Sequence, residues 1–545
     1  MQAQACYVIC VCFEIYKCRK ERQTKDGVRM LEKWLNNDGK VNFAATKELL
    51  KDIDLEAEKL KKEILESKTD VTVKGKRYYV SEKHGDDSND GLSPETAWKT
   101  TKNVNDGPVT YHDGVFYERG GIYRGQIKCK AGVTYSAYGE GEKPKIYGSP
   151  ENGAGEEKWS LVEGTDNIWC YYKPMKETGL IVYNEGEAYS VKEIPSFVNG
   201  KYVLRNSPEV EFDVKKHINF DLGHFNKQDG TLTDDKLPNM GVPGPLYVRC
   251  DKGNPGKIFN SIEFSVSGHV VAVGGWFNVH IDNLAIMYGG CHGVGAGTCK
   301  GLHVTNCYFG WIGGCIQFYF GPKSERYGTV VRFGNSIEIY GGCDDYVCDH
   351  NYIYQAYDAG ATHQLSAGGE QDCKQKNVKY TRNLFEYCVY SIEYFLGRPD
   401  STNALRFQQN ILIKDNIMRY GGFGFGIQRP DKGCVALLKS WDHHNPLDEN
   451  FLIEGNVFDR SRYMLIHCAA TKKEWIPEFN KNIYVQYLGE QTSSLGQIGT
   501  VPTTRTDYTE NIRELMDESS FDKEGGVYFC ERDGLYDLPD YSIKK

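Results

Sequence analysis

The chain lacks an excess of basic residues, and this absence limits its partners. Its 545 residues include 65 Lys and Arg against 74 Asp and Glu, so the formal net charge is −9 at neutral pH. Nucleic-acid binding draws on a basic stripe that neutralises phosphates, so we expect no nucleic-acid partner. The same acidity disfavours a strongly anionic polysaccharide as substrate, unless a local basic patch offsets it.

Long apolar runs are absent as well. No segment approaches the roughly 20 apolar residues of a membrane span, so we expect no membrane partner. Residues 5–13 are apolar, but Glu14 ends the run and no basic region precedes it. A secretory signal peptide has a basic start before its apolar core. We therefore expect a cytoplasmic protein, with secretion through an unrecognised leader as the weaker alternative.

The 18 cysteines lack the spacing of a disulfide framework or a zinc site. The one tight cluster lies within residues 6–18 and has no accompanying histidine. Many of the others, such as Cys307 and Cys348, stand beside apolar strand residues, where a free thiol behaves as a small hydrophobic side chain. This usage predicts a reducing compartment.

What the sequence does contain is a repeated unit, in which an alternating apolar strand runs into an asparagine. The copies are marked by Asn283, Asn306, Asn351, Asn383, Asn416 and Asn456, at intervals of 23, 45, 32, 33 and 40 residues. Such a unit buries its apolar face only by stacking on its neighbours. Asparagine tolerates a left-handed turn, and its side chain can bond the copies above and below. We predict an all-β, right-handed parallel β-helix; the alternative is an ordinary sheet protein with chance asparagines before turns.

The pattern divides the chain into five parts. Residues 1–75 form an N-terminal helical part, in which residues 20 to about 67 are charged with heptad-like apolar spacing; this predicts two helices joined at residues 36–39. We expect these helices to cap the first coil, the alternative being a solvated helical pair. Further along we expect the first coils over 76–155, an inserted β-sandwich-like subdomain over 156–268, the main β-helix with the active-site face over 269–470, and a capping tail with one helix at 511–516 over 471–545.

Three runs resemble the opening coil of pectate-lyase-like β-helix proteins. They lie at 78–100, 114–125 and 132–139, and the resemblance covers about residues 77–467. It is specific for the fold and weaker for activity, because lyases, epimerases and glycosidases share this scaffold. A sandwich inserted early in the helix is similar to glycoside hydrolase family 120, the β-xylosidases. The helical start is similar, as a second choice, to family 136, the lacto-N-biosidases.

A row of carboxylates is predicted on one face of the helix. A second strand follows each asparagine by about ten residues, at 314–318, 359–364, 390–395, 424–429 and, within the long coil, 335–340. Because strand side chains alternate, Glu338 and Glu393 face outward when Ile337 and Ile392 face the core. Asp358 opens the strand between them.

Stacked strands lie about 4.8 Å apart. Outward carboxylates on neighbouring coils therefore approach the about 5–5.5 Å of a retaining glycosidase pair, and a skipped coil approaches the about 6.5–9.5 Å of an inverting pair. Burial should raise at least one carboxyl pKa, as a general acid requires. We predict Asp358 as nucleophile and Glu393 as acid/base, with Glu338 as an assisting carboxylate or an alternative acid. The resemblance to family 120 implies the same Asp-then-Glu order. The alternative for each is a surface carboxylate on a polar face.

Polar and aromatic residues suited to a sugar surround this row. The candidates for substrate binding are Gln317, His363, Gln364, Arg398, Gln428, Arg429 and His467, with Trp311 and Tyr394 for stacking. The acidic group Asp344, Asp345 and Asp349 could bind Ca²⁺, as in lyases of this fold, but a solvated strand end is the preferred interpretation. We therefore expect no metal and no cofactor.

The hypothesis that follows is a retaining, exo-acting glycoside hydrolase that releases a terminal sugar or disaccharide from an oligosaccharide. The alternative is a polysaccharide lyase or uronate epimerase, which needs an Arg or Lys base. Only Arg398 and Arg429 offer strand-associated cations near the carboxylates. A second alternative is a non-catalytic carbohydrate-binding solenoid. The sequence leaves the sugar, its linkage and assembly into a homo-oligomer open.

Overall fold

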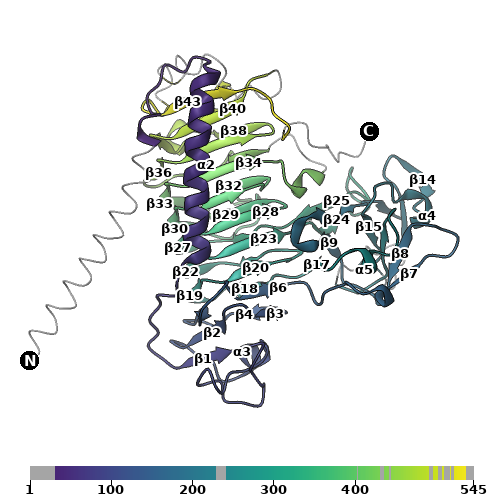
Figure 1. Cartoon of the computed structure of the whole chain (residues 1–545). Coiled ribbons are helices and arrows are strands. Elements are labelled where there is room, and N and C mark those ends of the chain that lie inside the picture. The colour runs from purple at the N-terminus through teal and green to yellow at the C-terminus, as the bar shows by residue number, and fades with distance from the viewer. Residues whose placement is uncertain are drawn as a thin grey trace, which may run out of the picture.

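A computed structural model describes residues 31–228, 238, 241–401, 403–429, 435–440, 443–489, 495–500, 506–507, 516 and 521–535. Three ten-stranded sheets, named A, B and C here, wrap around one axis, and each coil adds one strand to each sheet in turn (Figure 1). Every pairing in sheets A and B is parallel, and sheet C departs from this only at its last pair. The predicted parallel β-helix is confirmed.

The coils can be followed strand by strand. Sheet A contains β1 (Arg77–Val80), β2 (Gly114–Glu118), β5 (Thr134–Tyr138), β19 (Phe277–Asp282), β22 (Cys299–Thr305), β27 (Cys343–Asp349), β30 (Cys373–Thr381), β33 (Arg406–Lys414), β36 (Phe451–Glu454) and β39 (Glu478–Asn480). Sheet B contains β3 (Ile122–Arg124), β6 (Lys145–Tyr147), β20 (Ala285–Met287), β23 (Tyr308–Ile312), β28 (Tyr352–Ala356), β31 (Leu384–Glu386), β34 (Ile417–Gly421), β37 (Val457–Ser461), β40 (Ile483–Tyr487) and β43 (Gly526–Cys530). Sheet C contains β4 (Ile127–Lys128), β18 (Val271–Gly274), β21 (Val294–Ala296), β26 (Ile337–Tyr340), β29 (Ala359–Leu365), β32 (Tyr390–Leu396), β35 (Ala436–Lys439), β38 (Met464–Ala470), β41 (Gly496–Thr500) and β42 (Thr506–Asp507).

A ladder of buried asparagine side chains stacks at the turn from sheet A to sheet B. Asn383 Nδ2 donates to Asn416 Oδ1 at 2.9 Å, and Asn416 Nδ2 donates to Asn456 Oδ1 at the same distance. Asn351 precedes this series and Asn482 follows it. Each amide also satisfies a backbone N–H of the preceding coil, as for Asn383 N to Asn416 Oδ1 at 3.0 Å. The predicted bonding between copies is confirmed for these residues.

Two of the predicted copies are one residue out of register. Strand pairing sets Thr305 opposite Asp349, so Asn306 stands one residue before the position opposite Asn351. That position belongs to Cys307, whose backbone N–H donates to Asn351 Oδ1. The left-handed turn belongs to this preceding position, with φ 53° at Asn306 and 57° at His350. Asparagine thus serves two purposes at this corner: left-handed backbone in the early coils and side-chain stacking in the later ones.

A separate set of strands leaves the helix between β6 and β18. β8 (Ile168–Tyr171), β7 (Trp159–Leu161), β16 (Leu246–Arg249), β15 (Gly223–Asn226) and β11 (Val191–Lys192) form one sheet; β9 (Thr178–Tyr183), β10 (Ala188–Tyr189) and β17 (Ile262–Val266) form another; and β12 (Ser196–Val198), β13 (Lys201–Leu204) and β14 (Ser207–Glu211) form a third. Short helices α4 (Val214–His217) and α5 (Pro255–Ile258) join them. This inserted part projects to one side of the stack (Figure 1).

One long helix, α2 (Phe43–Glu66), lies along the outside of sheet B rather than over the end of the first coil (Figure 1). Its buried side chains Leu49, Ile53 and Ala57 recur at helical spacing and pack on the outward residues of sheet B. Before the helix, Trp34 O accepts a hydrogen bond from Tyr528 in the last coil; after it, Ser67 Oγ bonds Asn283 in an early one. The expectation of a cap on the first coil is wrong.

The coils also continue beyond residue 470, where a capping tail was expected. β39, β40, β41 and β43 extend the three sheets, and Asp522 takes the asparagine position after Asn482, with a 2.8 Å hydrogen bond. The helix expected at 511–516 lies outside the described residues except for Met516. Short helix α3 (Lys102–Asp106) completes the regular elements near the N-terminal coils.

The described cysteines are all free thiols, and all but Cys170 are buried, as expected of small core side chains. The tight cluster within residues 6–18 lies outside the described part. Within the part of the chain that the structure describes, no helix combines the length and apolar character needed to cross a bilayer.

Candidate functional site

An outward row of polar residues crosses five neighbouring strands of sheet C. Strand pairing places Glu338, Thr362, Glu393, Lys439 and His467 opposite one another, one per coil. The row lies outward because the adjacent residues, starting with Ile337, are fully buried in the core. Glu338 and Glu393 therefore share a face, as predicted, with one coil between them.

Glu338 is a buried carboxyl held by two amides. Asn335 Nδ2 donates to it at 2.5 Å, and Gln364 Nε2 donates to its two oxygens at 2.9 and 3.0 Å. Burial raises the pKa of Glu338 to about 8, although both amide hydrogen bonds oppose the shift. At neutral pH the side chain therefore holds a proton. Its neighbour Tyr340, two residues along β26, is 46% exposed, so this end of the row opens toward solvent.

Asp358 pairs with Arg429 just before β29 begins. The guanidinium donates to the Asp358 carboxylate; the side chain of Arg429 is 11% exposed and that of Asp358 is 15% exposed. Arg429 also lies 5.7 Å from the ring centre of Tyr357 and 5.5 Å from that of Tyr390. A guanidinium held in this way gives the carboxylate a charge-assisted hydrogen bond in a fixed position.

Asn335 connects these two carboxyl groups. Its Oδ1 accepts from the backbone N–H of Ala359, the residue after Asp358, at 2.7 Å, while its amide donates to Glu338. His292 Nδ1 in turn accepts from the Asn335 backbone at 3.0 Å. Asn335 therefore fixes where Glu338 stands relative to the start of β29.

Glu393 faces a buried lysine on the next strand. Lys439 Nζ is 3.2 Å from Glu393 Oε1, and it lies 3.7 Å from the ring centre of Tyr390. Burial raises the pKa of Glu393 against the charge of Lys439. Burial would lower the pKa of Lys439, but the Glu393 charge dominates and raises it. The pair is thus an internal ion pair at the centre of the row.

The inserted part and a hairpin rest against one end of this face. β24 (Cys315–Tyr319) and β25 (Val330–Phe333) form that hairpin, and Arg332 on it stacks 4.4 Å from the ring centre of Tyr357. Arg332 also donates to the carbonyls of Gly314 and Gly179 at 2.7 and 3.1 Å. The hairpin thereby links the insertion to the residue beside Asp358.

Several predicted site residues do join this face. Gln364 bonds Glu338, Arg429 bonds Asp358, and His467 stands next to Lys439 in the row, where its Nδ1 lies 3.0 Å from Ser440 O. Burial lowers the pKa of His467. Gln364 and His467 lie on the outward face of β29 and β38, whereas Arg429 reaches Asp358 from the end of a 3-10 turn.

Two others point into the core. His363 and Tyr394 are 0% and 1% exposed, stack on each other with ring centres 6.1 Å apart, and belong to the inward row of Ile339. His363 Nδ1 lies 2.7 Å from Tyr380 OH, and burial lowers the pKa of His363 to about 3. Neither side chain reaches a ligand on the outer face, so their assignment to substrate binding is wrong.

The remaining candidates lie elsewhere. Gln317 is on β24, which pairs antiparallel with β25 and is not a strand of sheet C. Trp311 is buried beneath the insertion beside Tyr189, and Gln428 bonds the Ser190 carbonyl at 2.9 Å, so both join the insertion to the helix. Arg398 is exposed in the loop after β32. The strand expected at 424–429 is a 3-10 turn, Phe425–Gln428, and the strand of that coil is β35.

Sequence reasoning missed Lys439, Tyr390 and Asn335. Lys439 lies beyond a long loop and a misplaced strand, so no offset from an asparagine pointed to it. Tyr390 and Asn335 fell within expected strands, but only the fold brings them against Lys439 and Glu338.

The acidic group considered for Ca²⁺ is occupied by basic side chains. Asp344 pairs with Lys376 at 3.4 Å, and Asp349 pairs with Arg382 at 2.5 Å. Asp345 lies 3.2 Å from His303. Among the described residues, no group of three or more His, Cys, Asp or Glu side chains is arranged to hold a metal ion.

Comparisons with known proteins give short or weak likenesses. No protein-family model matches the sequence. The lacto-N-biosidase of Bifidobacterium longum subsp. longum is 40% identical over 88 residues, which cover 14% of this chain and 5% of that protein. The chain thus spans a small fraction of the length of this curated relative.

Solved structures of a GH136 lacto-N-biosidase from Eubacterium ramulus share 14% and 13% identity in native and selenomethionine forms. The native form covers 83% of this chain and 65% of that chain with a TM-score of 0.35. The selenomethionine form covers 89% and 70% with a TM-score of 0.29. Likenesses of this strength carry no argument about the site.

Proposed function

We propose that the protein is a glycoside hydrolase that cleaves oligosaccharides on the outer face of sheet C. Glu338 acts as the general acid, and Asp358 acts as the anionic carboxylate. The observation that carries this assignment is the contrast between their surroundings. One carboxyl is buried among amides and keeps its proton, whereas the other is paired with a guanidinium. Carboxyls in opposed environments divide acid and base roles in glycosidases.

This assignment shifts the acid from Glu393, which the sequence favoured, to Glu338. A general acid must hold a proton near neutral pH. Lys439 neutralises Glu393 in its ionised form, while no cation lies within ion-pairing distance of Glu338 among the described residues. Glu393 and Lys439 then serve as an internal pair that positions Tyr390 and can bond sugar hydroxyls.

The finer proposals concern substrate and stereochemistry. The short match to a lacto-N-biosidase supports an oligosaccharide substrate and, as a specific proposal, the release of a lacto-N-biose disaccharide from a chain end. Asp358 then attacks the anomeric carbon as Glu338 protonates the departing oxygen. Water next displaces Asp358 as Glu338 takes a proton, and the configuration is retained.

A panel of nitrophenyl glycosides that includes the lacto-N-bioside tests the proposal. We expect release of nitrophenol by the wild-type chain and a loss of at least about a hundredfold in Glu338→Gln and Asp358→Asn. Proton NMR of the first-formed anomer decides between retention and inversion. Full turnover in both variants would overturn the site.

The second candidate, a polysaccharide lyase or uronate epimerase, gains one specific observation. Lys439 and Arg429 place two cations in direct contact with the carboxylates, with Lys439 in the role that the sequence gave to Arg398. A lyase needs a basic side chain and a cation for the uronate. Incubation with polyuronates distinguishes the two. A lyase produces the ultraviolet absorbance of an unsaturated uronide, which a hydrolase does not.

A further inference from the structure

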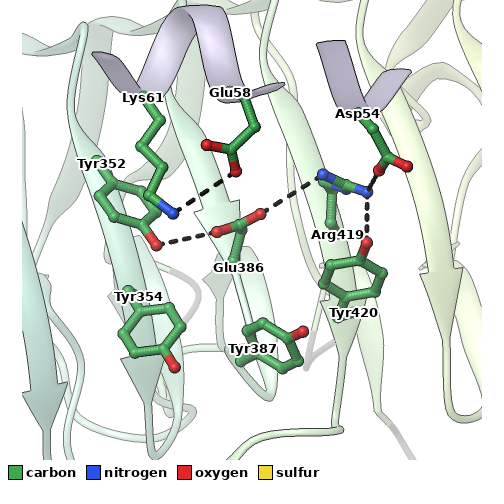
Figure 2. Close-up of a pocket in the computed structure, with 9 residues that line it drawn as sticks. All are labelled: Asp54, Glu58, Lys61, Tyr352, Tyr354, Glu386, Tyr387, Arg419 and Tyr420. Carbon is green, nitrogen blue, oxygen red and sulfur yellow. Dashed lines mark hydrogen bonds and ion pairs between the residues drawn. The ribbon is translucent and has the colours of Figure 1, made fainter. Parts of the chain in front are cut away.

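A cavity lies between α2 and sheet B, on a different sheet from the carboxylate row. It encloses about 450 Å³, within the about 300–1,000 Å³ of small-molecule sites. The residues that line it are Asp54, Glu58 and Lys61 on α2, and Tyr352, Tyr354, Glu386, Tyr387, Arg419 and Tyr420 on three successive coils (Figure 2). Four tyrosines and charged groups of both signs thus surround one space.

Two of these tyrosines occupy backbone positions that tyrosine seldom adopts. Tyr387 and Tyr420 have φ of 59° and 60°. They lie at a first corner, between sheets B and C, where Trp311, Gln355 and Arg460 stack in the same position and are also left-handed. Left-handed backbone is uncommon for bulky side chains and carries a free-energy cost at each position. The corner between sheets A and B is also left-handed and carries neither tyrosine nor tryptophan; its residues are Asn283, Asn306, His350, Arg382, Asp415, Gly455 and Lys481. Large aromatic rings at the first corner therefore serve a purpose other than the turn.

The rings form a continuous surface over neighbouring coils. The ring centres of Tyr354 and Tyr387 are 5.7 Å apart, and those of Tyr387 and Tyr420 are 4.9 Å apart. All three are only partly buried. No hydrogen bond joins the Tyr387 hydroxyl to any described residue, and in Figure 2 the hydroxyl is not engaged by the other lining residues. An amphipathic ring with an available hydroxyl suits a sugar, which presents an apolar face and a polar rim.

The charged groups of the cavity already compensate one another. Arg419 pairs with Asp54 and Asp459 and lies 3.6 Å from Glu386; Lys61 lies 3.7 Å from Glu58. Glu386 Oε2 also accepts from Tyr352 OH at 2.9 Å. Because each cation has a carboxylate partner, the cavity offers fixed hydrogen-bonding groups without a net attraction for anions. This favours a neutral ligand.

We propose that this cavity is a second carbohydrate site, which binds pyranose units of a neutral oligosaccharide on Tyr354, Tyr387 and Tyr420. The carboxylate of Glu386 and the guanidinium of Arg419 bond the sugar hydroxyls. The site belongs to sheet B and shares no residue with the row on sheet C, so it does not depend on the proposed hydrolase activity.

A glycan array of neutral and acidic oligosaccharides tests this proposal, followed by calorimetric titration of the best neutral ligand. The protein carries Glu338→Gln in every arm, so that turnover on sheet C does not consume the probe. The test variant adds Tyr387→Asn and Tyr420→Asn, because asparagine accepts the left-handed backbone and removes the rings. Tyr111→Ala, at an exposed tyrosine near the N-terminal coils, is the matched control.

We expect neutral glycans to bind and the dissociation constant to rise at least about tenfold in the double tyrosine variant, with no change in the control. A second variant, Glu386→Gln, keeps the shape and should weaken binding by a smaller factor. Circular dichroism melting confirms that each variant is folded. The proposal is overturned by an array without neutral ligands, by preference for acidic glycans, or by equal affinity in folded protein that lacks the two rings.

Discussion

Glu393 and Lys439 lie directly opposite each other on β32 and β35, and their charged atoms are 3.2 Å apart with 7% and 3% of the side chains exposed. Two charges removed from water in this way stabilise the fold only as a pair. Replacing only one of these two residues by an uncharged side chain should therefore destabilise the fold. The other carboxyls on the outer face of sheet C, Glu338 and Asp358, stand to one side with separate partners.

The Lys439→Met substitution should reduce the free energy of unfolding by about 3–5 kcal/mol, because it leaves Glu393 buried and unpaired. Chemical denaturation of the two proteins measures the difference. Lys201→Met, which removes an exposed partner of Glu211, is the control and should change stability by less than about 1 kcal/mol. The double variant Lys439→Met, Glu393→Leu should regain most of the loss. An unchanged single variant would contradict the internal pair.

Glu338→Gln should preserve the fold while it removes activity. The protonated carboxyl and an amide have similar shape, and both can bond Asn335 and Gln364. We expect kcat/KM to fall by about 10²–10⁴-fold, the usual contribution of a general acid. The melting temperature should stay near that of the wild type. Glu211→Gln at the surface should leave both quantities unchanged; equal losses in the two variants would argue against a special role of Glu338.

The raised pKa of Glu338 also predicts how stability depends on pH. Its pKa is about 8 in the folded chain, against 4.5 ordinarily. Between these values the folded state binds more protons than the unfolded state, so this group lowers stability as the pH rises. Its contribution to the slope is at most about 1.4 kcal/mol per pH unit. Urea denaturation from pH 5 to 8 should give a shallower decline in Glu338→Gln, and parallel profiles would refute the shift.

Asp358→Asn should abolish turnover and leave binding of the oligosaccharide largely intact. The amide is a poor nucleophile, and the substitution removes the carboxylate charge that faces Arg429. We expect kcat to fall at least about a hundredfold, with a smaller change in KM. Added formate should restore part of the rate if Asp358 supplies the attacking carboxylate. A loss of kcat that formate cannot relieve, together with a large rise in KM, would assign Asp358 to substrate binding instead.

The asparagine ladder should be sensitive to truncation at its centre. Asn416→Ala removes a buried amide that bonds both Asn383 and Asn456 and leaves their polar groups unsatisfied. We expect a loss of about 2–4 kcal/mol in the free energy of unfolding, since each unsatisfied buried group costs about 1–3 kcal/mol. The exposed Asn403→Ala serves as the control and should lose less than about 0.5 kcal/mol. A loss at Asn416 no larger than at Asn403 would mean that the ladder does not stabilise the coils.

The fold could be predicted because its signal repeats. Alternating strands and a stacked asparagine recur in each coil, and the period survives loops of different length. The register of the early copies could not be read in the same way. Asn283 and Asn306 adopt left-handed backbone one residue before the stacking position. The sequence alone does not distinguish an asparagine in a left-handed turn from one whose side chain stacks.

The site could be predicted where the alternation of side chains along a strand alone decides which face a residue occupies. Glu338 and Glu393 follow buried isoleucines by one residue, and both lie outward. The same alternation places Tyr394, two residues after Ile392, on the inward face, where it is buried. The prediction that its ring stacks on a sugar did not take this into account. Lys439 could not be predicted, because the loop before β35 hides its coil, and its meaning depends on Glu393, 46 residues earlier.

The course of α2 has a consequence for how the molecule forms. Stacked coils ordinarily hold only their nearest neighbours, so they can fray from either end. Here the segment around Trp34 and α2 touches both an early turn, near Asn283, and the last coil, at Tyr528. A ribosome releases this helix long before the strands on which it rests exist. The packing of this segment is therefore complete only after the final coil is made, and it then joins the two ends of the stack.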